Sequence, residues 1–338
     1  MRAMVLNEYS RPLVLEERPV PNVGPGDVLV RVRACGMCGT DLKIADGKLP
    51  GTRVPLVMGH EPAGEVVEVG SGVTGLAPGD RVVVHFYVTC GQCEFCRSQQ
   101  ETVCPQLLGR IGFELDGGYA DYLVAPARNL VKFPSTVPFE HAAILGDAVG
   151  TAFHAVKQRA RVSPEQTVVV MGCGGVGLHV LQVAKAFGAR VIAVDINQDK
   201  LELSKHYGAD EAIFFDEDYV RKVLSLAAGK VDCVIETVGL LETLTANLKV
   251  LRPRGRLVII GYAPGSAFPV NPLSTLLDEL EILGSRACTK EELAAVVDLT
   301  ARGLVRPVVT RRFPLEETNH ALDELRHGRI LGRAVIVP

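Results

Sequence analysis

Four of the nine cysteines of this 338-residue chain lie in a single stretch, CGQCEFCRSQQETVC (90–104). Their spacing is C-x2-C-x2-C-x7-C, formed by Cys90, Cys93, Cys96 and Cys104. Four thiolates can close a tetrahedral shell around Zn²⁺ and then leave no position for a substrate. We therefore predict a structural zinc site, with an iron–sulfur cluster or a set of unrelated buried thiols as the alternatives.

A second group of metal-binding side chains is spread over three short segments. Taken singly, each segment is a weak indication of a metal site, because a Gly-His-Glu tripeptide is more often a turn and Cys35 with Cys38 could be two core thiols. The spacing alone leaves their chemistry open. The segments are CGMCGTDLK (35–43) with Cys38, Thr40 and Asp41, MGHEPAGEVVEVG (58–70) with His60 and Glu61, and GDAVGTAFHA (146–155) with Asp147.

The stretch TVVVMGCGGVGLHVLQVAKAFGARVIAVD (167–195) has the order strand, glycine-rich turn, helix and strand. TVVVM is typical of a buried parallel strand, and GLHVLQVAKAFG has helical spacing that ends at Gly188. Gly172 permits a tight turn, Gly174 lets the backbone approach a pyrophosphate, and Gly177 lets the helix lie close to the strand. In this context the pattern predicts a dinucleotide site, with the pyrophosphate at the helix N-terminus.

Asp195, at the end of the second strand, indicates which dinucleotide binds. Its carboxylate can accept hydrogen bonds from the adenosine ribose hydroxyls and would repel a 2′-phosphate. Ile196 and Asn197, which follow it, offer no cation for that phosphate. The sequence therefore predicts NAD rather than NADP as the cofactor.

Strand and helix patterns continue to alternate after this unit and indicate one doubly wound sheet. Four later apolar runs bring the number of predicted strands to six, with helical segments such as 197–208 and 243–251 between them. The flanks of this region differ: short strands rich in Gly and Pro precede it, and a helix with a Thr289–Glu292 capping box and a final strand, GRAVIVP, follow it. The later runs are 211–215, 231–237, 256–262 and 280–285.

In their order along the chain, GMCGTD, GHEPAGEV, VGSGVTGLAPGDRV, the cysteine loop, DAVGTAFHA and GCGGVG resemble the zinc-containing medium-chain alcohol dehydrogenase family. The similarity runs from near Met1 to the closing GRAVIV. It implies an α/β fold in which a doubly wound, six-stranded parallel (Rossmann) sheet is inserted into a mostly β, GroES-like catalytic domain. The resemblance thus assigns 1–150 and 287–338 to the zinc-binding catalytic domain and 151–286 to the NAD-binding domain.

The resemblance also gives the dispersed side chains a role. It implies a catalytic zinc held by Cys38, His60 and Asp147, with Glu61 as a nearby or exchangeable ligand, and hence two Zn²⁺ per chain. Many relatives have cysteine at the position of Asp147, and a Cys/His/Asp set is harder and makes the ion more Lewis acidic. Three protein ligands leave a fourth position for water or an alcohol oxygen.

Two residues next to Cys38 are expected to assist the metal. By the resemblance, Asp41 accepts a hydrogen bond from the other ring nitrogen of His60 and fixes its tautomer, which is compatible with a carboxylate at a helix N-terminus. Thr40 matches the hydroxyl that contacts the substrate oxygen and passes its proton outward, with a helix N-cap as the simpler interpretation. Lys43 stands where several relatives continue this relay with a histidine.

Further cofactor contacts follow from the resemblance. Gly175 and Val176 complete the glycine-rich turn, and three residues at strand ends match cofactor-lining positions, namely Val238, Ile260 and Gly261. Arg333 matches a basic residue that reaches the pyrophosphate. Surface or packing roles are the alternatives for these last four. The remaining cysteines and several histidines are expected to be structural: Cys35, Cys173, Cys233, Cys288, His85, His141, His154 and His179.

Composition and charge exclude other classes of function. The 36 Lys and Arg residues and 39 Asp and Glu residues give a net charge of −3, which offers no basic face for nucleic acid or anionic lipid. The N-terminus has no uninterrupted apolar run, so we expect no signal peptide, no membrane span and a cytoplasmic protein with reduced thiols. An aromatic content of 5% favours an aliphatic substrate pocket.

The sequence therefore predicts an enzyme, a zinc-dependent oxidoreductase that transfers hydride reversibly between a small-molecule alcohol and NAD. A polyol, amino-alcohol or cyclic hydroxyacid-derivative dehydrogenase of the same family would share the zinc ligands and fits the motifs equally. A non-catalytic nucleotide-binding relative is the alternative from another class, and the joint presence of Cys38, Thr40, His60 and Asp147 argues against it. Relatives form dimers or tetramers, so we expect a homodimer or homotetramer.

Overall fold

Two units make up the chain in the computed structural model, which describes residues 1–229, 231–265 and 267–338. The chain leaves the first unit after Gly150 and again, for three residues, after Gly303, and returns to it each time. Compared with the bounds expected from the sequence, Ala287 and the short segment 304–306 belong to the second unit. The first unit comprises Met1–Gly150, Cys288–Gly303 and Pro307–Pro338, and the second comprises Thr151–Ala287 and Leu304–Arg306.

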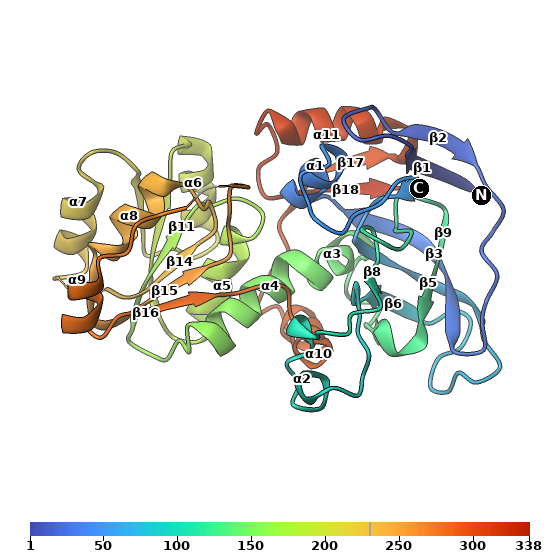
Figure 1. The fold of residues 1–338 in the computed structure, drawn as a ribbon, viewed down its shortest axis with the longest axis horizontal. Coiled ribbons are helices and arrows are strands. Elements are labelled where there is room, and N and C mark those ends of the chain that lie inside the picture. The colour runs from blue at the N-terminus through green and yellow to red at the C-terminus, as the bar shows by residue number, and fades with distance from the viewer. Residues whose placement is uncertain (230, 266) are drawn as a thin grey trace. The chain divides into compact units, whose positions relative to one another are not determined.

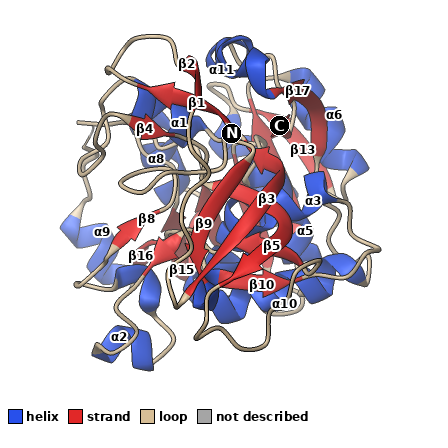
Figure 2. Ribbon diagram, turned by 90° about the vertical axis from the view of Figure 1, so that its right-hand side faces the viewer, coloured by secondary structure: helices blue, strands red, loops and turns tan. Residues whose placement is uncertain are grey.

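The first unit is built around a seven-stranded sheet with the strand order β10-β6-β5-β3-β18-β17, in which β9 also pairs with β3. Strand β3 alternates the buried Val28, Val30 and Val32 with the exposed Arg31 and Arg33, the two-residue period of a sheet with one solvated face. Figure 2 shows β3, β5 and β9 as long neighbouring strands. The strands are β3 (Asp27–Gly36), β5 (Glu61–Val69), β6 (Arg81–Val84), β9 (Tyr122–Pro126), β10 (Leu130–Lys132), β17 (Val309–Pro314) and β18 (Arg333–Val337).

The C-terminal strand β18 joins this sheet beside β3, with Val335 opposite Gly36 and Ile336 opposite Cys35. This pairing confirms the expectation that GRAVIVP returns to the first part of the chain. On its other edge β3 pairs antiparallel with β5, where Gly36 lies opposite Glu61. Three segments that are far apart in the sequence therefore meet at one end of the sheet.

Two smaller sheets and several helices complete the first unit. The hydroxyl of Thr289 accepts a hydrogen bond from the backbone N–H of Glu292, whose carboxylate accepts one from the N–H of Thr289, so the predicted capping box is confirmed. The small sheets have the order β2-β1-β4 and the pair β7-β8. The elements are β1 (Arg2–Leu6), β2 (Val14–Glu17), β4 (Leu56–Val57), β7 (Tyr87–Val88), β8 (Gly109–Arg110), α1 (Gly39–Ala45), α2 (Glu94–Arg97), α3 (Phe139–Ala143), α10 (Lys290–Ala301), α11 (Thr318–Arg326), the 3₁₀ turns Glu101–Val103, Ala127–Asn129 and Leu315–Glu317, and the π-helical turn Leu145–Val149.

The second unit contains six parallel strands in the order β13-β12-β11-β14-β15-β16. The strand order reverses direction between β11 and β14, which is the place where doubly wound sheets bind ligands at their carboxyl ends. In Figure 1 the sheet separates α8 from α5. The elements are β11 (Thr167–Met171), β12 (Arg190–Asp195), β13 (Glu211–Phe214), β14 (Val231–Glu236), β15 (Leu251–Ile259), β16 (Glu281–Gly284), α5 (Gly177–Ala186), α6 (Gln198–His206), α7 (Tyr219–Leu226), α8 (Leu241–Leu248) and α9 (Pro272–Leu277), preceded by α4 (Gly150–His154) and a π-helical turn (Ala155–Arg159).

Both faces of this sheet are buried, as the β-branched runs predict. Val169 and Met171 pack in one cluster with Tyr219 of α7 and Leu244 of α8, while Val168 and its alternate neighbours point to the other face and are equally buried. One helix is shorter than predicted from 243–251. It ends at Leu248 because Leu251 already pairs with Val231 at the start of β15.

The described residues contain no helix that is long and apolar enough to cross a membrane. Helix α10, for example, has 12 residues, whereas a transmembrane helix needs about 20.

Candidate functional site

The four dispersed side chains predicted to surround a metal converge in the first unit. One ligand atom from each of Cys38, His60, Glu61 and Asp147 lies within 4.8 Å of the others. His60 Nε2 is 3.8 Å from Asp147 Oδ2 and 3.9 Å from Glu61 Oε1. A sulfur, an imidazole nitrogen and carboxylate oxygens at these separations can be bridged by one ion of the size and preference of Zn²⁺.

The sheet and a distorted helix bring these residues together. Cys38 follows the end of β3, and His60 immediately precedes β5, so that the pairing of Gly36 with Glu61 places both at the same end of the sheet. A Cβ atom on Gly36 would lie 2.5 Å from Glu61 Oε2, so only glycine leaves room for this carboxylate. Asp147 is supplied by the π-helical turn Leu145–Val149, a backbone form often found at functional sites.

Asp41 fixes the orientation of His60. The two side chains are completely buried, and Asp41 Oδ1 accepts a hydrogen bond from His60 Nδ1 at 3.1 Å, which leaves Nε2 free to face the cluster. Its other oxygen accepts hydrogen bonds from the Tyr119 hydroxyl at 2.9 Å and from the Cys38 backbone N–H at 2.8 Å. The same carboxylate thus caps helix α1 and holds the imidazole, so that both roles considered for Asp41 occur together.

Arg333 also lies at the cluster, where its guanidinium faces two carboxylates. Its Nη2 is 3.1 Å from Asp147 Oδ2 and 3.4 Å from Glu61 Oε1, and Nη1 donates to the carbonyl of Met37 at 2.8 Å. It reaches this place because β18, which begins at Arg333, pairs with β3. The sequence suggested a pyrophosphate contact for this residue, with a surface or packing role as the alternative. Arg333 is 4% exposed, so a surface role is wrong, and the pyrophosphate contact stays a prediction.

Glu61 shows that the cluster is built for a cation. The side chain is completely buried, and neither of its carboxylate oxygens has a hydrogen-bond partner. Burial raises the pKa of Glu61 well above its usual value, with Arg333 opposing that effect. A buried carboxylate without hydrogen bonds, whose neighbouring cation Arg333 also pairs with Asp147, is costly unless a further cation satisfies it, so the residues present fit a divalent metal.

Thr40 lies beside the cluster, but not as a cap. Its Oγ1 is 3.5 Å from Cys38 Sγ, and Cys38, not Thr40, occupies the N-cap position of α1. The simpler interpretation of Thr40 as a helix N-cap is therefore wrong. Lys43 lies three residues further along the same short helix.

Aromatic side chains contact the His60 ring. The ring centroids of Phe86 and Phe113 lie 5.4 Å and 5.0 Å from that of His60, and the two phenylalanines stack on each other at 5.7 Å. The low aromatic content favoured aliphatic surroundings. The surroundings of the cluster nevertheless include two aromatic rings.

The four cysteines of the 90–104 loop also converge. Their Sγ atoms lie within 4.8 Å of one another, with 3.8 Å between Cys90 and Cys96, 3.9 Å between Cys93 and Cys104, and 3.6 Å between Cys104 and Cys90. Sulfurs placed tetrahedrally around one Zn²⁺ at its usual bond length would be about 3.8 Å apart. The separations therefore match a single metal ion bound by all four sulfurs. A multi-iron cluster would need space between the sulfurs for its own irons and sulfides.

Backbone N–H groups favour the ionised form of one of these thiols, Cys90, whereas burial raises the pKa of Cys96 to about 12. The N–H of Cys93 lies 3.4 Å from Cys90 Sγ, and the N–H of Cys96 lies 3.4 Å from Cys93 Sγ. Hydrogen bonds from the backbone at Gln92 and Cys93 lower the pKa of Cys90 to about 6. A thiol with such a pKa is mostly ionised at neutral pH and is ready to bind a cation.

The glycine-rich turn of the second unit has the geometry expected for a phosphate site. Gly172 has a φ of +89°, which suits glycine, and a Cβ on Gly177 would lie 1.8 Å from the carbonyl oxygen of Gly172. A Cβ on Gly174 would meet nothing within 4 Å, so this part of the backbone faces open space. Helix α5 begins at Gly177, after Gly175 and Val176. The fit to a pyrophosphate is therefore good.

Asp195 ties this turn to the end of β12. Its Oδ2 accepts a hydrogen bond from the N–H of Cys173 at 2.7 Å, and its Oδ1 accepts from the N–H groups of Ile196 and Asn197 at 2.8 and 3.0 Å. Asp195 as a whole is 7% exposed. Asp195 thus shapes the glycine-rich turn itself, a role that its position in the sequence did not reveal. Its ribose contact remains a proposal.

The other predicted cofactor residues stand at the carboxyl ends of the neighbouring strands. Val238 follows β14 and is 36% exposed, and Ile260 and Gly261 follow β15. The backbone N–H groups of Ile260 and Gly261 both donate to the carbonyl of Glu236, at 2.9 and 3.0 Å. These residues therefore lie along the edge at which a doubly wound sheet binds its ligand.

The residues expected to be structural are mostly buried. Cys35, Cys173, Cys233 and Cys288 are each completely buried. The rings of His85 and His179 are also buried. His85 contacts the backbone carbonyl of Cys288 at 2.8 Å, and His179 contacts the backbone carbonyl of Gly175 at 2.6 Å. None of these cysteines belongs to a metal-binding group among the described residues.

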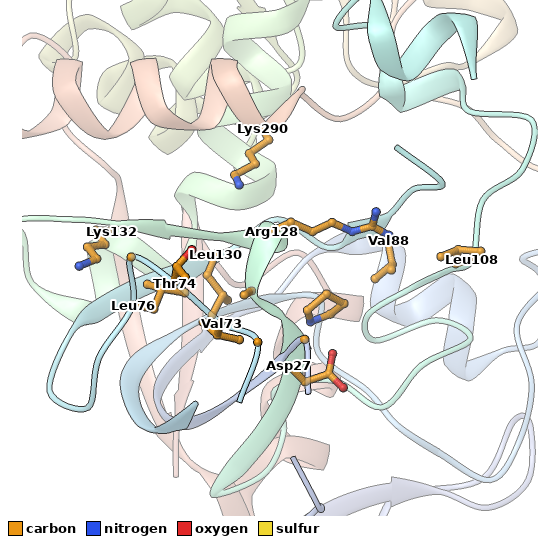
Figure 3. A pocket seen from close by; sticks show the side chains of 15 residues that line it. Asp27, Val73, Thr74, Leu76, Val88, Leu108, Arg128, Leu130, Lys132 and Lys290 are labelled. Atoms are coloured by element: carbon orange, nitrogen blue, oxygen red, sulfur yellow. The ribbon is translucent and has the colours of Figure 1, made fainter. Parts of the chain in front are cut away.

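A hollow of about 750 Å³ lies elsewhere in the first unit (Figure 3). Figure 3 shows Arg128, Lys132 and Lys290 around it, above an apolar floor that includes Val73 and Leu130. No ligand of either metal cluster is among its lining residues. It is therefore separate from the chemistry described here.

Two family models match the chain. Residues 24–135 match the alcohol dehydrogenase GroES-like domain, and residues 175–302 match the zinc-binding dehydrogenase domain. Together these ranges cover more than half of the chain, in the order expected for a Rossmann domain that follows the GroES-like part.

Known proteins match along the whole chain. An alcohol dehydrogenase from Geobacillus stearothermophilus is 38% identical over 339 residues, covering 99% of this chain and 98% of its own. Acryloyl-coenzyme A reductase from Metallosphaera sedula is 34% identical over 341 residues, and the match covers 99% of this chain and 99% of that protein. A solved structure of an NAD-dependent alcohol dehydrogenase is 32% identical, with a TM-score of 0.94 and coverage of 100% of both chains.

The chain belongs to the zinc-containing medium-chain alcohol dehydrogenase family. The predicted fold class, a GroES-like domain with a parallel Rossmann sheet, is confirmed. So is the predicted enzyme class, an oxidoreductase that acts on alcohols with NAD.

Proposed function

We propose that Cys38, His60 and Asp147 hold a catalytic Zn²⁺ with which this chain oxidises an alcohol reversibly, NAD being the hydride acceptor. The observation that carries the proposal is the convergence of a thiol, an imidazole and a carboxylate from three distant segments within 4.8 Å. When bound, zinc polarises the alcohol oxygen and lowers its pKa towards neutrality. Three protein ligands leave one coordination position open to a substrate.

The side chains around the ligands have distinct tasks in this proposal. Asp41 keeps the Nδ1 proton of His60 in place, so that Nε2 is the coordinating nitrogen. Arg333 holds one oxygen of Asp147 and balances the negative charge of the ligands. Thr40, 3.5 Å from the Cys38 sulfur, accepts the proton of the alcohol and passes it outward. Lys43 is the next group along α1 that can carry it.

Glu61 is proposed as an exchangeable ligand. Its Oε1 is 3.9 Å from His60 Nε2 and 3.4 Å from the guanidinium of Arg333, and neither contact is a hydrogen bond. The carboxylate can therefore pair with the metal or with Arg333 without breaking another interaction. This arrangement suits a ligand that leaves when a substrate takes its place.

A second Zn²⁺ per chain is proposed for Cys90, Cys93, Cys96 and Cys104. The sulfur separations of 3.6 to 3.9 Å agree with one tetrahedral ion. Because all four positions of the ion are then occupied by protein, this zinc stabilises the loop and takes no part in the reaction. The need of both clusters for reduced thiols also supports the proposed cytoplasmic location.

NAD is proposed to bind at the glycine-rich turn, with its adenosine ribose at Asp195. We expect Asp195→Asn to lower the preference for NAD over NADP, measured as the ratio of kcat/KM values, by about tenfold. The substitution removes the charge that repels a 2′-phosphate and keeps one of the two oxygens that accept backbone N–H groups, either that for Cys173 or that for Ile196 and Asn197. Glu202→Gln, at an exposed position of α6, is the matched control and should leave the ratio unchanged. Wild-type turnover with NADP alone would refute the assignment.

The substrate is proposed to be an alcohol, with polyols, amino alcohols and cyclic hydroxyacid derivatives as the alternatives within the family. The zinc ligands do not separate these classes, because the ion that they would hold acts only on the reacting oxygen. A screen of NAD reduction across aliphatic, aromatic, polyol and cyclic alcohols tests the proposal. Zinc-dependent reduction of NAD by at least one class is the expected result. A fully folded, zinc-loaded chain that binds NAD but oxidises none of them would contradict it.

A second copy of the chain is the proposed partner. Helix α9 exposes Leu273, Leu276 and Leu277 to 64%, 71% and 69%, and β16 is an edge strand of the six-stranded sheet. Exposed leucines next to an unpaired strand edge are typical of a surface that another chain covers. A homodimer or homotetramer formed through this edge would bury both features.

A further inference from the structure

Glu236, the last residue of β14, is a buried carboxylate satisfied by N–H donors. Its side chain is completely buried. Oε1 accepts hydrogen bonds from the backbone N–H groups of Val238 at 2.7 Å and Gly239 at 2.9 Å, and Oε2 accepts one from Asn247 Nδ2 at 2.7 Å. No lysine or arginine within the described part of the chain acts on it as an ion-pair partner. A charge buried without a cation is costly. The contribution of Glu236 must therefore come from the N–H groups that its carboxylate binds.

The carboxylate of Glu236 binds the turn 237–239. This turn contacts two other segments at the carboxyl end of the sheet, where NAD is proposed to bind. The Thr237 hydroxyl donates to the carbonyls of Met171 and Gly172, both at 2.9 Å. A Cβ on Gly239 would lie 2.4 Å from the carbonyl of Gly261, so the two backbones are in direct contact. The turn therefore cannot move without displacing the glycine-rich turn or the end of β15.

The backbone of Glu236 holds the third segment. Its carbonyl accepts the N–H groups of Ile260 and Gly261, while its carboxylate accepts those of Val238 and Gly239. One residue thus fixes both of the loops that follow β14 and β15. Through Thr237, the first of these loops also supports Gly172.

We propose that Glu236 is a positioning residue for NAD, which locks the 237–239 turn against the glycine-rich turn and the Ile260–Gly261 segment. The proposal rests on the function assigned to this edge above. Removing the acceptor leaves two backbone N–H groups unpaired, and the turn then relaxes towards water. NAD binding must reorder it, so affinity falls while the metal clusters of the first unit are unaffected.

The hydrogen bonds that extend from Glu236 through Asn247 to Tyr219 suggest matched control variants. The Tyr219 hydroxyl donates to Asn247 Oδ1 at 2.6 Å and so orients the amide that meets Glu236. Tyr219→Phe removes a buried hydrogen bond of the same network but leaves both backbone bonds of Glu236. Glu236→Gln retains one oxygen for those N–H groups. Its amide can donate to a flipped Asn247, whose NH₂ then meets the Tyr219 oxygen.

The test measures NADH affinity by calorimetry and amide hydrogen exchange at residues 238 and 239 in the zinc-loaded, full-length protein. We expect Glu236→Leu to weaken NADH binding about tenfold and to abolish the exchange protection. Glu236→Gln and Tyr219→Phe should each stay within about threefold of the wild type. If the leucine variant does not fold, Glu236→Asp, which withdraws the acceptors by one methylene, should show the same loss.

Two results would overturn the proposal. One is NADH affinity in a folded Glu236→Leu or Glu236→Asp protein equal to that of Tyr219→Phe, which would make Glu236 an ordinary core residue. The other is loss of affinity in Glu236→Gln as large as in the leucine variant although exchange protection persists. A wild-type protein that binds no NADH would instead refute the proposed cofactor site, while the exchange measurement would still report on the turn.

Discussion

Replacing Cys38 by alanine is expected to lower kcat/KM for the alcohol by about a thousandfold or more. The substitution removes one of three protein ligands of the proposed catalytic zinc, and without the ion nothing else in the cluster lowers the pKa of an alcohol by several units. NAD binding should be retained, because the glycine-rich turn and Asp195 lie in the other unit of the chain. Steady-state kinetics, NADH calorimetry and zinc content together check this expectation.

Cys35 provides the matched control for this variant. It lies three residues before Cys38, is completely buried, and is absent from the metal-binding groups found in the described residues. Cys35→Ala should keep both zinc ions and most of the activity, with only the small stability loss of a trimmed core thiol. Unchanged turnover in Cys38→Ala would instead show that the reaction does not depend on this zinc.

Replacing Cys93 by serine is expected to act on stability. The variant should contain one zinc per chain instead of two, and its unfolding midpoint should fall by about 10 °C. The reason is that the regular structure of the loop 90–104 is limited to a four-residue helix and a 3₁₀ turn, so that the ion held by its four sulfurs would contribute much of its order. Calorimetric unfolding and metal analysis measure both changes.

The chemistry of the surviving Cys93→Ser enzyme should be nearly normal. We expect kcat per correctly assembled molecule within about twofold of the wild type, because all four positions of this ion are taken by protein. Gln92→Ser, in the same loop but without a ligand role, should retain both ions and the wild-type midpoint. A Cys93→Ser protein that is fully stable and assembled but inactive would contradict the structural role of this site.

The features that could be predicted from the sequence are local ones. The four sulfurs of the cysteine loop are fixed by their spacing within one short stretch, and the turn at Gly172 is bounded by a strand and a helix on either side. The dispersed ligands required the family resemblance, because nothing local to Cys38, His60 or Asp147 shows that β3, β5 and a π-helical turn bring them together.

Residues that act through tertiary contacts could not be found in this way. Arg333 reaches Asp147 across 186 positions of sequence only because β18 pairs with β3. Tyr119 donates to Asp41 from a separate segment. For Glu236 there was one signal, a carboxylate directly after the apolar residues 233–235, but its partners depend on the turn that follows.

The central claim is that a metal with an open position is held by Cys38, His60 and Asp147. Its most direct test is elemental analysis of fully active wild-type protein, combined with a chelator titration followed by activity. We expect two zinc ions per chain and a loss of turnover that tracks removal of one of them while the cysteine loop stays loaded. Full activity in protein with a single zinc, bound only by Cys90, Cys93, Cys96 and Cys104, would contradict it.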